Sequence, residues 1–167
     1  MLRPLQFWIA LAAGVTFFAR PSLAATPPYP IPSDTVIILQ KGYCERECPM
    51  YRVIVFANGD VIWQGIDHVR RKGLALGHLT PDQVREVIDA FKSIDYLHLQ
   101  NIYGVRGKGC TTTQNSMFAQ VTSTSMTIDG QSHALGHDSG CIGDVSTRIA
   151  VAEKKMDEIT DTARWIK

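Results

Sequence analysis

Four cysteines are the residues of this chain whose types and spacing point most directly to chemistry. An even set of cysteines is typical of proteins that form disulfides in an oxidising compartment. Cys44 and Cys48 are four residues apart in a short loop closed by Pro49, so one turn can bring their α-carbons within bonding range. Cys110 and Cys141 lie outside the two ends of a predicted hairpin, which brings them to about the same height. We therefore predict two structural disulfides, Cys44–Cys48 and Cys110–Cys141.

The first cysteine pair also has a redox interpretation. Thioredoxin-like proteins use a C-x-x-C spacing at the start of a helix, near a βαβ unit. Here Cys44 and Cys48 have the spacing C-x-x-x-C, and no βαβ pattern precedes them. Thiol–disulfide exchange is therefore an alternative to the structural disulfide that we expect.

Metal binding is a second alternative for the same region. The possible ligand sets are Cys44, Cys48 and Met50, which are soft ligands suited to cuprous copper, and His133, His137 and Cys141, of which the two histidines share a strand face. Neither set has a known ligand spacing, and cysteines in an oxidising compartment are usually paired. We predict no metal and no other cofactor.

His137 and Ser139 raise the question of hydrolytic chemistry. They belong to a G-H-D-S-G segment that superficially resembles the sequence around the nucleophile of a serine protease. Chymotrypsin-like enzymes have glycines where His137 and Cys141 stand, and their double barrel needs a longer chain. A turn is the simpler interpretation, and we predict no catalytic residue.

Two further segments carry cations. Gly104 to Gly109 reads GVRGKG, but it lacks the G-x-x-x-x-G-K-[ST] spacing of a phosphate-binding loop. Arg70-Arg71-Lys72 could meet an anionic surface, although such runs usually lie in solvated loops. We interpret both as loop segments.

Hydrophobic periodicity predicts the elements that position these residues. Asn58-Gly59 and Asp129-Gly130 are strong hairpin turns, each between two runs rich in β-branched or alternating residues. The five predicted strands are 36–39, 51–57, 61–65, 118–128 and 131–137. A further strand at 74–76 has a weaker pattern, and 100–116 is predicted as a long loop.

Two helices complete the pattern. Thr80 and Pro81 provide a cap and a first-turn proline, and an apolar stripe follows at Val84, Val87, Ile88, Phe91 and Ile94. The second predicted helix covers about 144–160, with a stripe at Val145, Ile149, Ala152, Met156 and Ile159. Each helix has one apolar face, so both are expected to pack on the sheet.

The first 24 residues are typical of a secretory signal peptide. They contain an early Arg3, an apolar run over 5–19, and small residues before a predicted cleavage after Ala24. The run is shorter than the ~20 residues that span a bilayer, so no stable membrane span is expected. Residues 25–33 are predicted to be a proline-rich tether, and 34–167 a single domain.

Charge excludes one class of partner. Removing Arg3 and Arg20 from the 17 basic residues leaves 15 against 16 acidic ones, a net charge of −1. Proteins that bind nucleic acids usually present a strongly basic surface. No nucleic-acid partner is therefore expected.

The order of these motifs resembles the family of bacterial exported domains of unknown function numbered 6438. The most specific motif is C-x-x-x-C-P-x-Y, here Cys44 to Tyr51, preceded by DTVIILQ. The resemblance continues with the Asn58-Gly59 hairpin, T-P-x-Q-V-x-x-V at a helix start, Gly140-Cys141, and an ending near Arg-Trp-Ile. It covers about 33–167. The family has no assigned activity, so the resemblance implies no reaction.

Together these patterns predict an α+β domain. It would have an antiparallel sheet of about five strands and two helices on one face, in the order βββ-α-ββ-α. We expect an exported, non-enzymatic binding or structural module of the cell envelope, whose partner is an envelope protein or a glycan. The alternative is a small thiol-redox, metal-binding or hydrolytic protein that uses Cys44/Cys48 or His137/Ser139. A pocket joining His137 to another titratable group would favour the alternative.

Overall fold

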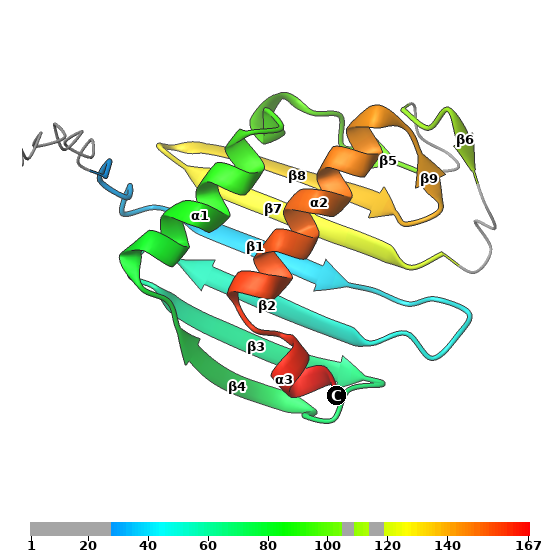
Figure 1. Ribbon diagram of the computed structural model, residues 1–167, viewed down its shortest axis with the longest axis horizontal. Helices are drawn as coiled ribbons and strands as arrows, with labels where there is room; N and C mark the ends of the chain where they lie inside the picture. Colours follow the sequence, from blue (N-terminus) through cyan, green and yellow to red (C-terminus); the bar gives the residue numbers. More distant parts are fainter. Residues whose placement is uncertain (1–27, 105–108, 114–118) are drawn as a thin grey trace, which may run out of the picture.

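The computed structural model describes residues 28–104, 109–113 and 119–167 (Figure 1). The predicted signal segment, its cleavage site after Ala24, and the first residues of the predicted tether lie outside the described residues. The same holds for 105–108, the centre of the glycine-rich segment. Within the described ranges, no helix combines the length and apolar character needed to cross a membrane.

The main sheet has seven strands in the order β4-β3-β2-β1-β7-β8-β5 (Figure 1). Its pairs are antiparallel except for β5 and β8, which are parallel. The strands are β1 (Val36–Lys41), β2 (Met50–Phe56), β3 (Asp60–Asp67), β4 (Gly73–His78), β5 (Ile102–Tyr103), β7 (Val121–Ile128) and β8 (Gln131–Asp138). A second, two-stranded sheet pairs β6 (Thr112–Thr113) with β9 (Cys141–Ile142).

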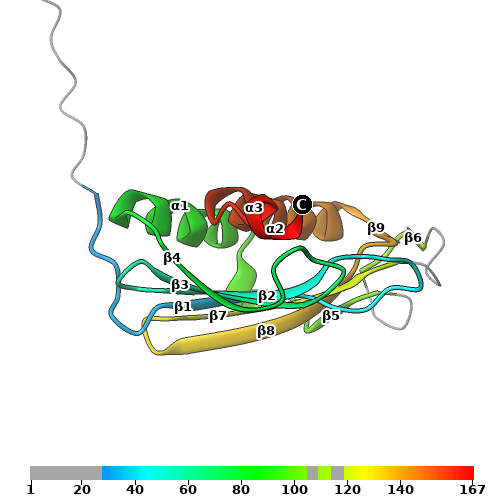
Figure 2. The same cartoon turned by 90° about the horizontal axis from the view of Figure 1, so that it is seen from below.

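The helices of the described ranges lie on one face of the main sheet, and no described helix or strand covers the opposite face (Figure 2). The helices are α1 (Pro81–Lys92), α2 (Asp144–Ile159) and the short α3 (Ala163–Ile166), with a 3-10 turn, η1, at Tyr96–His98. The predicted α+β class, both hairpins and both long helices are therefore confirmed.

The expected sheet of about five strands was too small. β4 was predicted only weakly, because Gly73 and Gly77 interrupt its apolar alternation and the strand depends on pairing with β3. β5 and β6 lie inside the predicted loop 100–116, and two-residue strands leave no periodic pattern to detect. The order βββ-α-ββ-α must therefore be corrected for the added strands and for α3.

The core lies between the sheet and the helices. Ile37 and Leu39 of β1 point inward opposite Val55 and Val53 of β2, and all four side chains are fully buried. Helix α1 begins at a capping box, in which the Thr80 hydroxyl accepts from the backbone of the third helical residue. The apolar stripe of α1 then packs on these strands.

The C-terminal helix α3 covers the sheet near β3. The ring of Trp165 stacks on Trp63 at 5.1 Å, and Trp63 in turn stacks on Tyr51 at 4.6 Å between ring centroids. Aromatic pairs at these distances add to the stability that burial provides.

Both predicted disulfides are present. Cys44 is joined to Cys48 in the β1–β2 connection, and Cys110 is joined to Cys141 at β9. Figure 1 shows the β1–β2 connection and β9 at the same end of the sheet. The two disulfides therefore brace one end of the domain.

Candidate functional site

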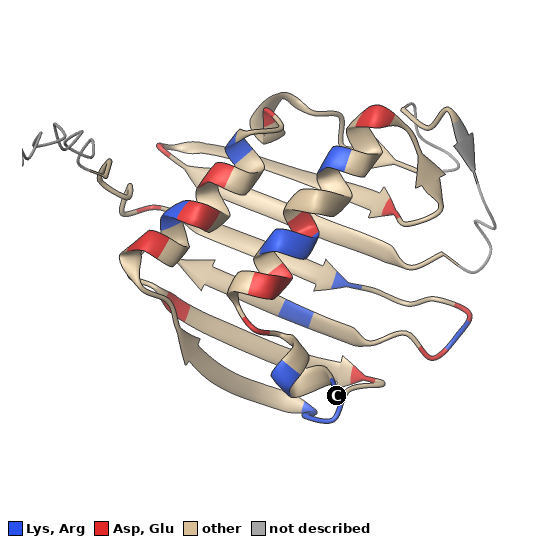
Figure 3. Ribbon diagram, viewed as in Figure 1, with Lys and Arg blue, Asp and Glu red and all other residues tan. Residues whose placement is uncertain are grey.

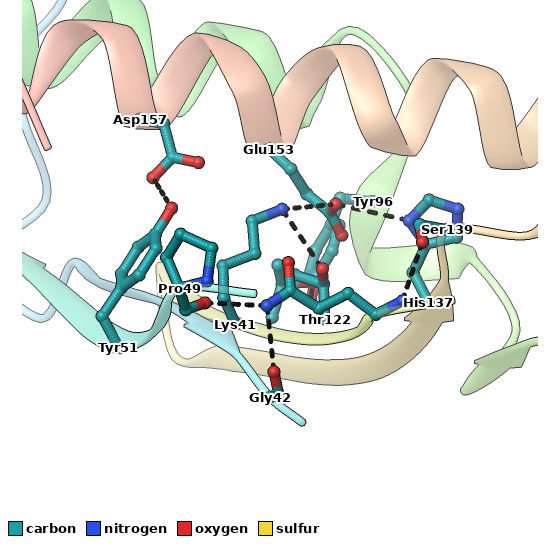
Figure 4. Close-up of polar contacts among 12 residues, drawn as sticks. Lys41, Gly42, Pro49, Tyr51, Tyr96, Thr122, His137, Ser139, Glu153 and Asp157 are labelled. Carbon is teal, nitrogen blue, oxygen red and sulfur yellow. Dashed lines mark hydrogen bonds and ion pairs between the residues drawn. The ribbon is translucent and has the colours of Figure 1, made fainter. Parts of the chain in front are cut away.

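A row of polar side chains crosses four strands at the end of the sheet beside the disulfides. Backbone pairing places Lys41 of β1 between Tyr51 of β2 and Thr122 of β7, and places Thr122 opposite His137 of β8. Side chains at paired positions point to the same face of a sheet. The four therefore line up on the inner face, below α2 (Figure 4).

Glu153 is the residue of α2 that meets this row. It follows Ile149 by four residues and precedes Met156 by three, so it lies on the buried stripe of the helix. Only 2% of its surface is exposed. A carboxylate at such a position is costly unless cations and hydrogen-bond donors compensate it.

Two basic groups approach one oxygen of this carboxylate. Glu153 Oε2 lies 3.5 Å from Lys41 Nζ and 3.3 Å from Nδ1 of the buried His137 (Figure 4). Lys41 Nζ also donates to Thr122 Oγ1 at 3.2 Å. Oε2 is thus held between a lysine and a histidine supplied by different strands.

The other oxygen of this carboxylate is different. Glu153 Oε1 is buried and has no hydrogen-bond partner within the described part of the chain. Leaving a buried carboxylate oxygen unpaired costs free energy, so such an atom requires a physical explanation. A donor on a bound molecule would provide one.

A cavity of about 450 Å³ adjoins this cluster. It lies between the ends of β1, β7 and β8, strand β9 and helix α2. Its polar lining residues are Lys41, Gln120, Thr122, His137, Ser139, Ser146, Thr147, Glu153, Lys154 and Asp157. This volume falls within the ~300–1,000 Å³ of typical small-molecule sites. We call this cavity the α2 pocket.

A larger hollow of about 790 Å³ lies at the opposite end of β1 and β2. Its lining includes the apolar side chains of Val36, Phe56, Ile62 and Leu76, and Asp60 is its one ionisable residue among those described. It has no cluster of titratable groups. Of these two hollows, the α2 pocket is therefore the one suited to chemistry that needs charged side chains.

The rim of the α2 pocket is fixed by Gln120. Its side-chain Nε2 donates to the carbonyl oxygens of Gly42 at 2.9 Å and Pro49 at 2.7 Å, and so ties the first disulfide loop to the start of β7. Its backbone N–H donates to Ser139 Oγ at 3.0 Å. The second disulfide contributes Cys141 to the lining. Both disulfides therefore support the mouth of the pocket.

Asp157 and Tyr51 form a second polar contact under α2. The Tyr51 hydroxyl donates to Asp157 Oδ1 at 2.8 Å (Figure 4). Burial raises the pKa of the Asp157 carboxyl, and nearby Lys41 together with the Tyr51 hydrogen bond only partly offsets this. Burial and the adjacent Asp157 charge also raise the pKa of Tyr51. Ionised Asp157 is thus less favourable in the folded protein than in the unfolded chain.

Asp157→Asn should therefore stabilise the domain at neutral pH, by about 0.5 to 1 kcal/mol. A carboxyl whose pKa is raised on folding contributes stability below its unfolded pKa, ~3.9, and that contribution is lost as the pH rises through the folded pKa. Asparagine keeps an oxygen for Tyr51 and has no charge to desolvate. Urea titrations at pH 7 and pH 3 would show the advantage at pH 7 shrinking at pH 3.

Glu158→Gln is the matched control, because Glu158 is the next residue on α2 and is exposed. Its effect should be small at both pH values. If Asp157→Asn destabilised the domain at pH 7, the carboxylate would be favoured by its neighbours and our account of this contact would be wrong.

The sequence-predicted residues are only partly assembled here. His137 and Ser139 both line the α2 pocket, but within the described residues no hydrogen bond joins them. Cys44 and Cys48 are paired with each other, so neither is a free thiol. His133 lies against the Tyr96 ring, with centroids 5.5 Å apart. The disulfides thus take the cysteines out of both proposed ligand sets, whereas His137 and Ser139 lie at one pocket without a hydrogen bond between them among the described contacts.

The predicted metal ligands form no site among the described residues, and the basic run 70–72 lies away from the α2 pocket. The described residues contain no cluster of three or more His, Cys, Asp or Glu arranged to hold a metal ion. Arg70 donates to the Arg164 carbonyl, Arg71 to the Leu74 carbonyl, and Lys72 pairs with Asp67 at 2.7 Å. The basic run is therefore engaged locally at the β3–β4 turn.

Sequence reasoning did not single out Lys41, Gln120, Glu153 or Asp157. Only Glu153 carried a usable signal, because a charged residue four positions after Ile149 interrupts the predicted core stripe of α2. Lys41 and Gln120 are recruited by strand pairing and by the β1–β2 connection. Those contacts join residues that are far apart in the sequence.

These features define a class: an α+β domain with two disulfides and a polar pocket beneath its second long helix. The chain belongs to the family described as Domain of unknown function (DUF6438), whose profile matches residues 35–160. The resemblance seen in the sequence is thus confirmed. The matched region includes all four cysteines and the charged residues of the α2 pocket. A search of the curated proteins gave no match.

Proposed function

We propose that this domain is an exported binding module that holds a small polar ligand in the α2 pocket. The observation that carries the proposal is the buried, unpartnered Oε1 of Glu153 beside a cavity. A ligand with an N–H or O–H donor would pair this oxygen after a rotation of the carboxylate that turns Oε1 toward the cavity. The unbound protein already bears the free-energy cost of this desolvated oxygen. A ligand that pairs the oxygen removes that cost and therefore binds more tightly.

The neighbouring groups narrow the class of ligand. Lys41 is a donor beside Glu153, and the Ser139 hydroxyl keeps its own proton for donation because it accepts from the Gln120 N–H. The ligand therefore needs acceptors as well as a donor. Amino sugars whose nitrogen is not acylated carry an ammonium group and several hydroxyls, so we propose an amino-sugar unit of this kind in an envelope glycan.

Action outside the cytoplasm is part of this proposal. The two disulfides support it, because they persist in oxidising compartments and are rare in the cytosol. The signal-like first 24 residues support it independently. An envelope glycan is accessible only in such a compartment.

Glucosamine should bind the domain with millimolar affinity, and Glu153→Gln should weaken binding at least tenfold. A dissociation constant near 1 mM corresponds to about 4 kcal/mol, a size that one charged hydrogen bond and several neutral ones can supply. Glutamine keeps the side-chain length and removes the charge that would face the ammonium group. Amide NMR titration would locate the shifts and give both affinities.

Glucose and Glu158→Gln are the controls for that titration. Glucose lacks the ammonium group and should bind more weakly, whereas Glu158→Gln lies on the exposed side of α2 and should bind glucosamine like the wild type. Shifts that do not saturate, or that map away from Ser139 and Thr147, would refute the proposal.

A hydrolytic function is the second candidate, favoured by the contact between His137 Nδ1 and Glu153 Oε2. A carboxylate that orients a histidine is the arrangement of a general base. The pocket thus joins His137 to a titratable group, which favours the alternative function. Turnover of p-nitrophenyl acetate that Ser139→Ala abolishes would support this candidate, and turnover unaffected by Ser139→Ala and His137→Gln would exclude it.

A further inference from the structure

The two edges of the main sheet differ in how they are protected. One edge is β5, only two residues long, and the other is β4, six residues long (Figure 1). Natural sheets protect long edges with proline, charged side chains or a covering segment. The sequence of β4, GLALGH, has no proline and no charge apart from its terminal His78. Among the described strands, none lies beyond it.

The backbone alternation of β4 shows which groups face this edge. Leu79 N–H donates to the Gly59 carbonyl oxygen at 2.8 Å, so the odd-numbered residues turn their backbone groups toward β3. Leu74, Leu76 and His78 therefore turn theirs outward. The Arg71 guanidinium reaches the Leu74 carbonyl oxygen at 3.3 Å, in agreement with an outward orientation.

The side chains of β4 extend an apolar row on the uncovered face of the sheet. Backbone pairing aligns Ile38, Ile54, Ile62 and Leu76 across β1, β2, β3 and β4. At the edge, Leu76 is 79% exposed and Leu74 is 65% exposed. Large apolar side chains at an open edge are typical of surfaces that pair with another chain.

We propose that β4 pairs antiparallel with β4 of a second copy of this chain. With Ala75 on the two-fold axis, Leu74 of each copy lies opposite Leu76 of the other. Both residues present outward backbone groups, so each such pair forms two hydrogen bonds, in one of which the Leu74 carbonyl oxygen uses the lone pair that Arg71 of its own copy leaves open. A continuous fourteen-stranded sheet results, and the four leucines meet on its uncovered face.

Charge complementarity selects a second copy of this chain as the occupant. The β3–β4 turn carries Arg70, Arg71 and Lys72, whereas the other end of β4 lies beside Asp60, which pairs with His78 at 3.2 Å (Figure 3). Antiparallel self-pairing places Lys72 opposite His78 and near Asp60 of the second copy. Lys72 keeps its own pair with Asp67 at 2.7 Å, and Asp60 of the second copy is a further carboxylate near this basic end.

Ala75→Cys should give a disulfide-linked dimer on mild oxidation. Residues opposite each other in a non-hydrogen-bonded antiparallel pair have α-carbons about 4.5 Å apart, within disulfide range. Leu74→Cys is the matched control, because residue 74 faces residue 76 of the second copy and not its own equivalent. Non-reducing electrophoresis should show a covalent dimer for Ala75→Cys and much less for Leu74→Cys.

Light scattering gives an independent measurement on the wild-type protein. We expect a dimer that Leu76→Lys converts to a monomer, while circular dichroism shows that the variant stays folded. The proposal would be overturned if the wild-type protein stayed monomeric at all concentrations up to about 1 mM, because a dissociation constant that high corresponds to an association free energy of only about 4 kcal/mol. Pairing of β4 with a different protein would not change that conclusion. A dimer that persists in Leu76→Lys, with no cross-linking of Ala75→Cys, would place the interface elsewhere. Neither outcome depends on the α2 pocket.

Discussion

Phe91→Ala should lower the free energy of unfolding by about 3 to 5 kcal/mol. Phe91 is fully buried at the centre of the inner stripe of α1, and its ring meets the edge of Tyr96 at 5.1 Å between centroids. Truncation removes the ring from the core and leaves a cavity that α1 cannot close without losing its own contacts. A urea titration followed by circular dichroism would measure the loss.

Lys92→Ala is the control for that experiment, because Lys92 is the next residue on α1 and is exposed. Its nitrogen lies 5.4 Å from the centre of the Tyr29 ring, a contact worth about 1 kcal/mol at an exposed site. Equal losses for the two variants would show that Phe91 does not define the inner face of α1.

The parts of the fold that the sequence predicted are those held by local signals. Asn58-Gly59 and Asp129-Gly130 specify their hairpins through residues that tolerate left-handed backbone angles, and Asp129, Gly59 and Gly130 adopt positive φ. Thr80 and Gln83 likewise start α1 through contacts within one turn. Each signal is contained in a few adjacent residues, so it can be detected without the tertiary structure.

The strands that were missed or only weakly predicted depend on pairing between distant segments. β5 has only two residues, and it exists because Ile102 and Tyr103 lie beside Gly136 and His137 of β8. β4 was predicted only as a weak strand at 74–76, and its full length is specified by pairing with β3. β5 has no periodic pattern of its own and glycines interrupt that of β4, so the number of strands was underestimated.

The residues of the candidate site likewise fall into those that the sequence could indicate and those that depend on the tertiary structure. His137 and Ser139 could be selected by residue type, and both line the α2 pocket. Their partners could not, because Lys41 reaches Glu153 across 112 residues of sequence. The β1–β7–β8 register brings Lys41 near His137, and the packing of α2 on the sheet brings Glu153 to both. Residue types therefore suggested where chemistry could occur, whereas the pairing register determines which groups meet.

Removing the Cys110–Cys141 disulfide by a double serine substitution should cost about 4 kcal/mol. The bond closes a loop of 31 residues, and the loss of unfolded-state entropy grows with the logarithm of loop length. The same substitution at Cys44 and Cys48 opens a loop of four residues and should cost about 2 kcal/mol. Urea titrations of the two double variants, without reductant, compare the two bonds directly.

Loss of the Cys110–Cys141 disulfide should also affect the α2 pocket. Cys141 is the first residue of β9, which leads directly into α2, and it lines the cavity together with Ser146 and His137. A stability of 5 to 15 kcal/mol is typical of a domain, so a loss of about 4 kcal/mol is a large share of it. The domain without this bond should therefore unfold at much lower urea concentrations than the domain without Cys44–Cys48. If the domain without Cys44–Cys48 unfolded at the lower urea concentration instead, this short disulfide would stabilise the native state by more than chain entropy predicts. The loop that Gln120 anchors would then be the source of the extra stability.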